Sequence, residues 1–254
     1  MIRTKIASSA IIFGLALLCA DVVAARAAEI TVLSSTGVKT ALEELAPQFE
    51  KTTGNKLNIT FNASNLLKND VDVGKSFDVI ILTPSLINEL IKQGKVADGS
   101  AVNVARAGIG VAVKKGAPRP DISSVDAFKR ALLNAKSIAY TTAGQSGLQF
   151  AKVIEDLGIA DQVKAKGKTV PGGSAGELIV KGEADMAVQL IPELMAVRGI
   201  RVVGPFPKEI QSYVVLTAGI SANAKDKAAA QALIKFLIAP SAAPVIKAKG
   251  MEPG

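Results

Sequence analysis

The chain has 254 residues, a formal net charge of +8 at pH 7, no histidine, no tryptophan and a single cysteine. Without histidine it cannot hold a Ser-His-Asp triad, a histidine zinc site or a histidine acid–base catalyst. Because its lysines are spread along the chain and its aromatic content is only 4%, the composition also argues against nucleic-acid binding by base stacking.

The N-terminus has the pattern of a secretory signal peptide. Arg3 and Lys5 precede an apolar run over residues 11–19, and small residues follow it up to Ala27. The apolar run is much shorter than the roughly 20 residues of a membrane span. We therefore expect cleavage after Ala27 and a periplasmic mature protein. Lipid attachment at Cys19 stays open as an alternative fate of this signal.

Beyond the signal, short β-branched or apolar runs alternate with amphipathic patterns of helical period. This alternation is typical of an α/β fold. The predicted strands cover residues 30–33, 57–61, 78–82, 108–113, 138–140, 186–188, 200–203 and 213–216. The predicted helices cover or include residues 38–49, 66 onward, 84–94, 125–133, 148–157, 178–179, 227–238 and 242–249.

The chain contains no linker rich in proline, glycine and serine and no repeat of fixed period. A protein of two lobes joined by two crossing strands would show this absence. After a signal peptide at residues 1–27, we predict lobe 1 from residues 28–107 plus 216–254 and lobe 2 from residues 108–215. A ligand cleft is expected between the two lobes.

Four clusters of small and polar residues lie where a predicted strand ends and a helix begins. They cover residues 34–37, 63–65, 141–147 and 172–176. Helix starts offer free N–H groups that bind anions, and this edge of an α/β sheet is where ligands bind. Each cluster alone also fits an ordinary helix cap or turn. Because two clusters come from each half, facing lobes would bring four helix starts to one cleft.

One cluster, Gly172 to Gly176, also matches the Gly-x-Ser-x-Gly pattern of a hydrolase nucleophile. No apolar strand runs directly into Ser174, and the histidine base is missing. An exported hydrolase would have to use Ser174 or Ser64 with a lysine base such as Lys68. An exported structural protein without a ligand is a further alternative. We expect a binding protein and no enzyme.

Two carboxylate pairs have a spacing that could suggest metal ligands, namely Asp70 with Asp72 and Glu183 with Asp185. Their alternation with apolar neighbours indicates solvent-facing positions, and hard cations need several convergent oxygen ligands. We therefore predict no metal site and no cofactor.

Several short sequence motifs, used here as marks, follow one another along the chain in a specific order and spacing. They are Ile30-Thr31-Val32 before small residues, Ala41-Leu42-Glu43-Glu44-Leu45, Ser64 with Leu67, Asp78-Val79, Ser146-Gly147, Gly182-Glu183-Ala184-Asp185 and Phe236-Leu237. With these marks nearly the whole mature chain resembles the periplasmic molybdate-binding proteins. The resemblance implies the type II periplasmic binding protein fold, in which mixed sheets flanked by helices form two lobes. It also implies a monomer that delivers its ligand to an ABC transporter permease.

That family holds a tetrahedral oxyanion through two serines, two backbone N–H groups and a tyrosine. By resemblance, Ser64 matches the second serine and Ser146 the first backbone donor. The first serine falls on Gly37, so a neighbouring hydroxyl would have to replace it, and the tyrosine falls near Gln189. The expected ligand-binding residues are Ser35, Thr36, Gly37, Ser64, Ser146, Gly172, Gly173 and Gln189.

These two departures leave the ligand open, because each charge-assisted hydrogen bond contributes about 1.5–3 kcal/mol. One hypothesis is an oxyanion of the molybdate or tungstate type. The other is an organic carboxylate that accepts a hydrogen bond from the Gln189 amide.

Overall fold

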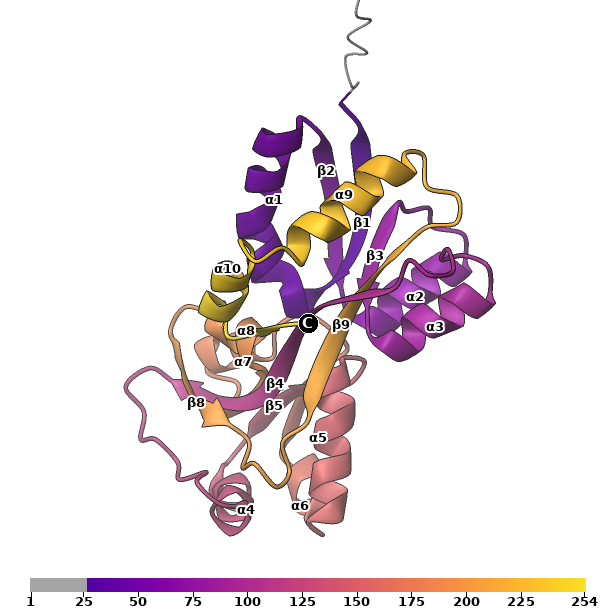
Figure 1. Ribbon diagram of the computed structural model, residues 1–254. Helices are drawn as coiled ribbons and strands as arrows, with labels where there is room; N and C mark the ends of the chain where they lie inside the picture. Colours follow the sequence, from indigo (N-terminus) through magenta and orange to yellow (C-terminus); the bar gives the residue numbers. More distant parts are fainter. Residues whose placement is uncertain (1–26) are drawn as a thin grey trace, which may run out of the picture.

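The computed structural model describes residues 27–254 as two lobes connected by long strands (Figure 1). The predicted signal peptide, with Cys19, lies outside these residues up to position 26. In the part that the structure describes, no helix has the length and apolar character needed to cross a membrane.

The strands of residues 27–254 form a mixed sheet with the order β2-β1-β3-β9-β4-β7-β5-β6, and both β8 and β10 also pair with β4. The parallel pairs are β1 with β2 and β3, and β5 with β6 and β7, whereas β9 runs antiparallel to β3 and β4. The strands are β1 (Glu29–Ser35), β2 (Lys56–Asn62), β3 (Val79–Leu82), β4 (Val102–Lys114), β5 (Ile138–Thr141), β6 (Gly167–Val170), β7 (Met186–Leu190), β8 (Ile200–Pro205), β9 (Tyr213–Ile220) and β10 (Glu252–Pro253).

Helices cover both faces of the sheet in each lobe (Figure 1). In lobe 1 the helices are the 3-10 turn η1 (Thr36–Val38), α1 (Lys39–Thr53), α2 (Ser64–Asp72), α3 (Pro84–Lys92), α9 (Lys227–Leu237) and α10 (Ala243–Ala248). In lobe 2 they are α4 (Val125–Asn134), α5 (Gln145–Asp156), α6 (Ala160–Lys164), α7 (Gly176–Val180) and α8 (Ile191–Met195).

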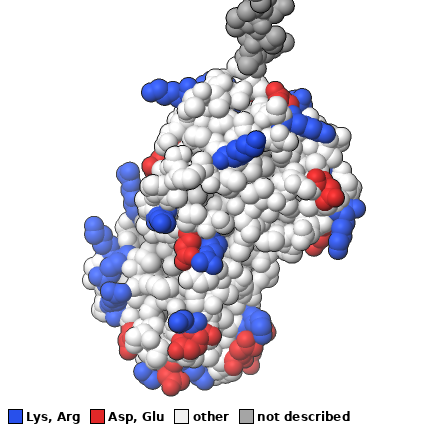
Figure 2. Space-filling view, in the orientation of Figure 1, with Lys and Arg blue, Asp and Glu red and all other residues white. Residues whose placement is uncertain are grey.

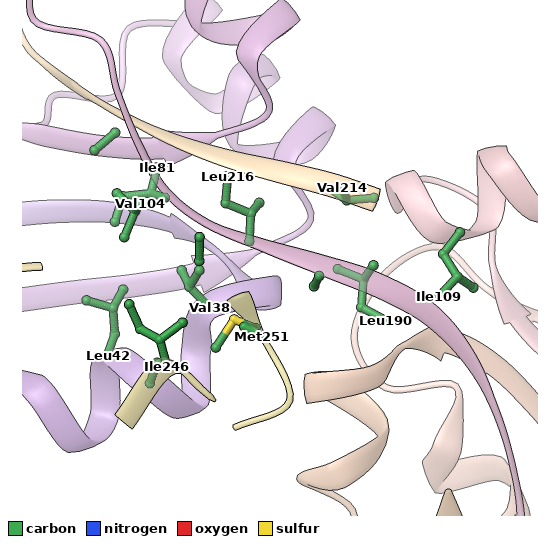
Figure 3. Packing of buried hydrophobic residues seen from close by; sticks show 14 of the residues in the cluster. Val38, Leu42, Ile81, Val104, Ile109, Leu190, Val214, Leu216, Ile246 and Met251 are labelled. Carbon is green, nitrogen blue, oxygen red and sulfur yellow. The ribbon is translucent and has the colours of Figure 1, made fainter. Parts of the chain in front are cut away.

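Strand residues of lobe 1 alternate between two cores, as expected from the period of a β-strand. Val79 and Ile81 pack with α1 and α9, whereas Ile80 and Leu82 pack with α2 and α3. The first of these cores continues into lobe 2 without a break, through Ile109, Leu190 and Val214 among others (Figure 3). The two lobes therefore share buried apolar side chains where they meet.

Strand β4 changes partners along its length. Its residues Val102 to Gly108 pair with β9, and its residues Ile109 to Val113 pair with β7. The C-terminal strand β10 adds to β4 at Ala105 and Arg106. Strand β4 thus belongs to both lobes, and we keep the names lobe 1 and lobe 2 for the predicted parts on either side of this change.

The predicted α/β class and the mixed sheets are confirmed, and each predicted strand and helix is present with boundaries that differ by a few residues. Four short elements were missed, namely α6, β6, α8 and β10. Each has five residues or fewer, which is too short for a helical or strand period to show in the sequence.

Gly37 provides a test of the packing between the lobes. A Cβ atom at this position would lie 2.9 Å from Leu216 Cδ1 and 3.0 Å from Leu190 Cδ1. We expect G37A to lower the free energy of unfolding by about 1–3 kcal/mol through overpacking, measured by urea denaturation. G172A is the matched control, because its Cβ would lie no closer than 3.4 Å to any neighbour. Equal stability of the two variants would contradict this account of Gly37.

Candidate functional site

An enclosed cavity lies between the two lobes, at the carboxyl ends of strands from both. Lobe 1 contributes the end of β1 and the start of α2, and lobe 2 contributes the ends of β5 and β7, the start of α5 and part of α8. The lining residues are Ser35, Thr36, Ala63, Ser64, Thr141, Gly144, Gln145, Ser146, Gly172, Gly173, Gln189, Leu190, Glu193 and Val214.

Seven of the eight predicted site residues line this one cavity. That they contact a ligand remains a prediction. The exception is Gly37, which is buried beside the cavity against Leu216 and Leu190 and whose N–H donates to Ser35 Oγ at 3.3 Å. Gly37 thus does not line the cavity, its lack of a side chain is explained by packing, and its contact with a ligand stays an untested prediction.

The starts of helices α2 and α5 face the cavity. Neither helix has a side chain that caps its first turn, although Ser64 and Ser146 stand within those turns and are buried. The first N–H groups of a helix have no partner inside the helix and carry the positive end of its dipole. The two helix starts, one from each lobe, can therefore bind anionic groups from opposite sides.

Gln189 has a structural role besides the predicted one. Its Nε2 donates to the carbonyl of Gly173 at 2.8 Å, and its Oε1 accepts from the N–H of Ala175 at 2.9 Å. The amide is thus engaged within lobe 2, where it holds the glycine loop in place. That the Gln189 amide also donates to a ligand stays a prediction.

Glu193 is the only ionisable side chain among the described residues that line the cavity. It lies on α8, a helix that the sequence did not reveal, and its Oε1 accepts a hydrogen bond from Thr36 Oγ1 of lobe 1 at 2.5 Å. This contact joins the two lobes inside the cavity. It also engages the Thr36 hydroxyl that was predicted to bind the ligand.

Burial raises the pKa of the Glu193 carboxyl group from 4.5 to about 7, against the opposing effect of hydrogen bonds from Thr36, Gln189 and the backbone N–H of Leu190. The residue as a whole keeps some exposed surface, but its carboxyl end is enclosed. Glu193 can therefore take up and release a proton near neutral pH.

Thr141 belongs to one of the four predicted clusters but is not among the expected ligand-binding residues. It ends β5, lines the cavity and is only 3% exposed, and its hydroxyl has no hydrogen-bond partner among the described residues. The close approach of the following loop depends on Gly147, since a Cβ there would lie 1.7 Å from the Thr141 carbonyl oxygen. An unsatisfied buried hydroxyl is costly, which makes Thr141 a candidate ligand donor.

The two lobes are closed around the cavity. Besides the contact between Thr36 and Glu193, Asn65 Nδ2 of lobe 1 donates to the Ala143 carbonyl of lobe 2 at 3.1 Å. The cavity volume is about 20 Å³, whereas one water molecule needs roughly 10–15 Å³. A ligand of several carbon atoms does not fit this volume, so the lobes must stand further apart than here both when it enters and when it is bound.

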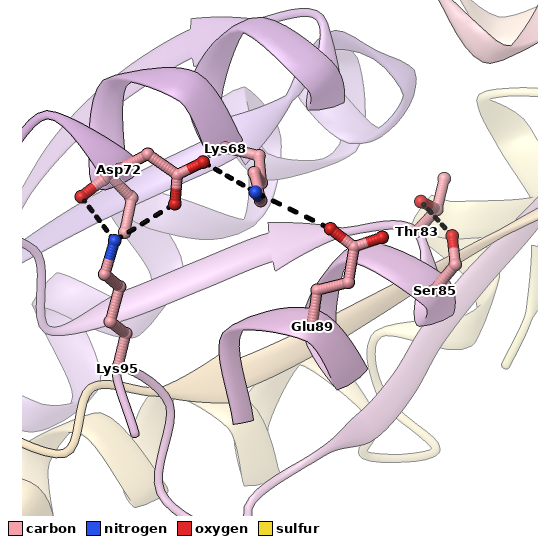
Figure 4. Close-up of polar contacts among 7 residues, drawn as sticks. Lys68, Asp72, Thr83, Ser85, Glu89 and Lys95 are labelled. Atoms are coloured by element: carbon pink, nitrogen blue, oxygen red, sulfur yellow. Dashed lines mark hydrogen bonds and ion pairs between the residues drawn. The ribbon is translucent and has the colours of Figure 1, made fainter. Parts of the chain in front are cut away.

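The lysine base of the alternative hydrolase hypothesis is held in its charged form. Lys68 Nζ lies 2.6 Å from an oxygen of Asp72 and 3.6 Å from one of Glu89, and Asp72 also binds Lys95 (Figure 4). The hydrogen bond with Asp72 raises the pKa of Lys68. A protonated lysine cannot activate a serine, so this arrangement contradicts the proposed serine–lysine pair.

Other charged residues lie dispersed on the surface. On the face shown in Figure 2 both basic and acidic side chains occur over the two lobes, and basic side chains line the left edge of the lower one. Among residues 27–254, no group of three or more acidic, histidine or cysteine residues is placed to hold a metal ion. Asp70, one of the carboxylates considered above, pairs instead with Lys75 at 3.1 Å.

Residues 30–252 match the family model described as bacterial extracellular solute-binding protein. The chain is 33% identical to an aconitate isomerase of Pseudomonas sp over 230 residues, which are 88% of this chain and 87% of that protein. It is 29% identical to the molybdate-binding protein ModA of Azotobacter vinelandii over 238 residues, which are 89% and 91% of the two chains.

A structural comparison confirms the type II periplasmic binding protein fold. The periplasmic molybdate-binding protein of Azotobacter vinelandii superimposes with a TM-score of 0.76 at 22% identity, over 89% of this chain and 99% of that one.

The expectation that the chain is no enzyme is corrected by the sequence comparison, because a relative matched along most of its length is named as an isomerase.

The raised pKa of Glu193 predicts a pH-dependent stability. Between pH 4.5 and about 7 the unfolded chain ionises this carboxyl while the folded protein keeps it protonated, so stability falls as pH rises. E193Q removes the effect. We expect E193Q to match the wild type near pH 4.5 and to exceed it at pH 8 by up to about 3 kcal/mol, in urea unfolding at both pH values. A constant difference would rule out the raised pKa.

Proposed function

The chain belongs to the bacterial extracellular solute-binding protein family, and from this premise we propose that it binds a small unsaturated polycarboxylate of the aconitate class and isomerises it. The observation that carries the proposal is a cavity with anion-binding helix starts on two sides and a single carboxyl group, Glu193, in its wall. The 33% identity to an aconitate isomerase supports it.

The polar groups of the cavity favour an organic anion over a tetrahedral oxyanion. An oxyanion presents charge on all sides and therefore needs donors all around it. Here the Thr36 hydroxyl and the Gln189 amide are engaged in other hydrogen bonds, and Glu193 places a carboxyl group where a tetrahedral oxyanion needs a donor. An organic polycarboxylate can direct its carboxylates to the helix starts and place a C–H group against Glu193.

Closure of the two lobes around the ligand is part of the same proposal. The contacts from Thr36 to Glu193 and from Asn65 to Ala143 join lobe 1 to lobe 2, so they must break when the cleft opens. Rotation about the strands between the lobes is the usual means in hinged binding proteins. A periplasmic location, a monomeric state and delivery of ligand to an ABC transporter permease complete the proposal.

The ligand class is tested by thermal unfolding of the mature chain with cis-aconitate, trans-aconitate, the saturated analogue tricarballylate, molybdate and sulfate. A ligand at 100 times its Kd adds about 2.7 kcal/mol, which raises Tm by roughly 5–10 °C for a chain of this size. We expect this shift with the aconitates and no shift with molybdate or sulfate. A shift with molybdate alone would return the ligand to the oxyanion class.

Substitution of Thr141 tests whether its hydroxyl contacts the ligand. T141V removes an unsatisfied buried hydroxyl at nearly constant shape, so the free protein should gain about 1 kcal/mol or remain unchanged. The Kd for aconitate, measured by calorimetry, should rise about tenfold through the lost hydrogen bond. T141S is the matched control and should bind like the wild type. Unchanged affinity in T141V would exclude Thr141 from the ligand contacts.

A further inference from the structure

We propose that the Glu193 carboxyl group carries the proton that moves between two carbon atoms of the bound ligand, and that Thr36 of the opposite lobe positions it. This inference rests on the proposed function and assigns its chemical step. It starts from geometry, because Glu193 lines the enclosed cavity and its Oε1 is held by Thr36 Oγ1 at 2.5 Å.

The reaction requires one group that both accepts and donates a proton. In aconitate a methylene carbon and an alkene carbon flank the same central carbon, and each bears a carboxylate. Removal of a methylene proton breaks a C–H bond, and its electron pair forms a double bond to the central carbon. The original alkene pair then forms a C–H bond at the other carbon, using the returned proton. One proton leaves, one returns, and nothing is oxidised or reduced.

The intermediate between these two transfers is an anion spread over the carbon chain and its carboxylates. Groups that stabilise it must face the ligand before the reaction, as oxyanion holes do. The uncapped starts of α2 and α5 meet this requirement, because their N–H groups come from opposite lobes and face the cavity. The geometry of the new double bond is set by the conformation about the single bond between the methylene and central carbons when the proton leaves, so the shift can produce the other geometric isomer.

Glu193 is suited to this role by its surroundings. Burial raises the pKa of its carboxyl group to about 7, and acid–base catalysis is most effective when the pKa lies near the working pH. No neighbouring charge contributes to this shift, and the other described residues of the cavity wall do not ionise in this range.

Glu193 also has an ordinary structural role, which the test must separate from catalysis. It is the third residue of α8 and accepts a hydrogen bond from the backbone N–H of Leu190, the residue before that helix. Glutamine serves equally well in such a capping arrangement. A helix cap does not need a hydrogen bond from the other lobe. The contact with Thr36 therefore indicates that Glu193 does more than cap α8.

The experiment compares the mature wild type, E193Q and the control E177Q, which changes an exposed glutamate on α7 away from the cavity. Binding of cis-aconitate is measured by calorimetry. Isomerisation is followed by chromatography, and proton transfer by deuterium uptake from heavy water. We expect E193Q to keep the Kd within about tenfold and to lose at least 10²-fold in turnover and deuterium uptake. E177Q should match the wild type.

Thr36 is tested through the pH dependence of kcat/KM. The wild-type rate should fall below about pH 7, where Glu193 becomes protonated. The hydrogen bond from Thr36 lowers the pKa of Glu193, so T36V should move this acidic limb to higher pH, whereas T36S should leave it in place. A loss of rate at all pH values without such a shift would overturn the positioning role.

The outcomes separate this inference from the proposed function. Turnover by E193Q at the wild-type rate would overturn the assignment of Glu193 and leave the proposed function intact. Binding of aconitate by the wild type without isomerisation or deuterium uptake would overturn the proton-transfer step and leave the binding function. Absence of binding by the wild type would refute the proposed function itself.

Discussion

The division of strand β4 between two sets of partners is the constraint on which the rest of the structure depends. One half pairs with β9 and the other half with β7, so a single strand fixes how the two lobes face each other. The carboxyl ends of the parallel strands in both lobes then meet at one cavity. Four loops that are distant in sequence come together there, and each supplies small residues or a helix start.

The sequence predicted the fold and the general position of the site well, because both depend on patterns that extend over many residues. Alternating strands and helices indicate the α/β class, and the small-residue clusters mark the strand ends that surround the cavity. The details depend on tertiary contacts. Gly37 packs against two leucines beside the cavity, and the Gln189 amide holds its own loop. Neither fact leaves a trace in local sequence.

Glu193 was missed because α8 has only five residues and a single glutamate carries no periodic signal. Its hydrogen bond to Thr36 spans 157 positions. The absence of histidine does not exclude acid–base chemistry, since a carboxyl group whose pKa burial raises to near neutral can perform it. Only the folded chain shows that this carboxyl group stands among neutral donors in an enclosed cavity, where capture of an anion and a proton transfer are chemically compatible.

The placement of the C-terminal strand has a practical consequence. Strand β10 pairs with β4 beside the point where that strand changes partners, and Arg106 binds Glu252 there. The N–H of Gly254 donates to the Val104 carbonyl at 3.1 Å. A purification tag or fluorescent reporter attached after Gly254 would thus begin beside the strand that the two lobes share. A reporter of the proposed closure belongs on a helix of each lobe that lies away from β4 and β10.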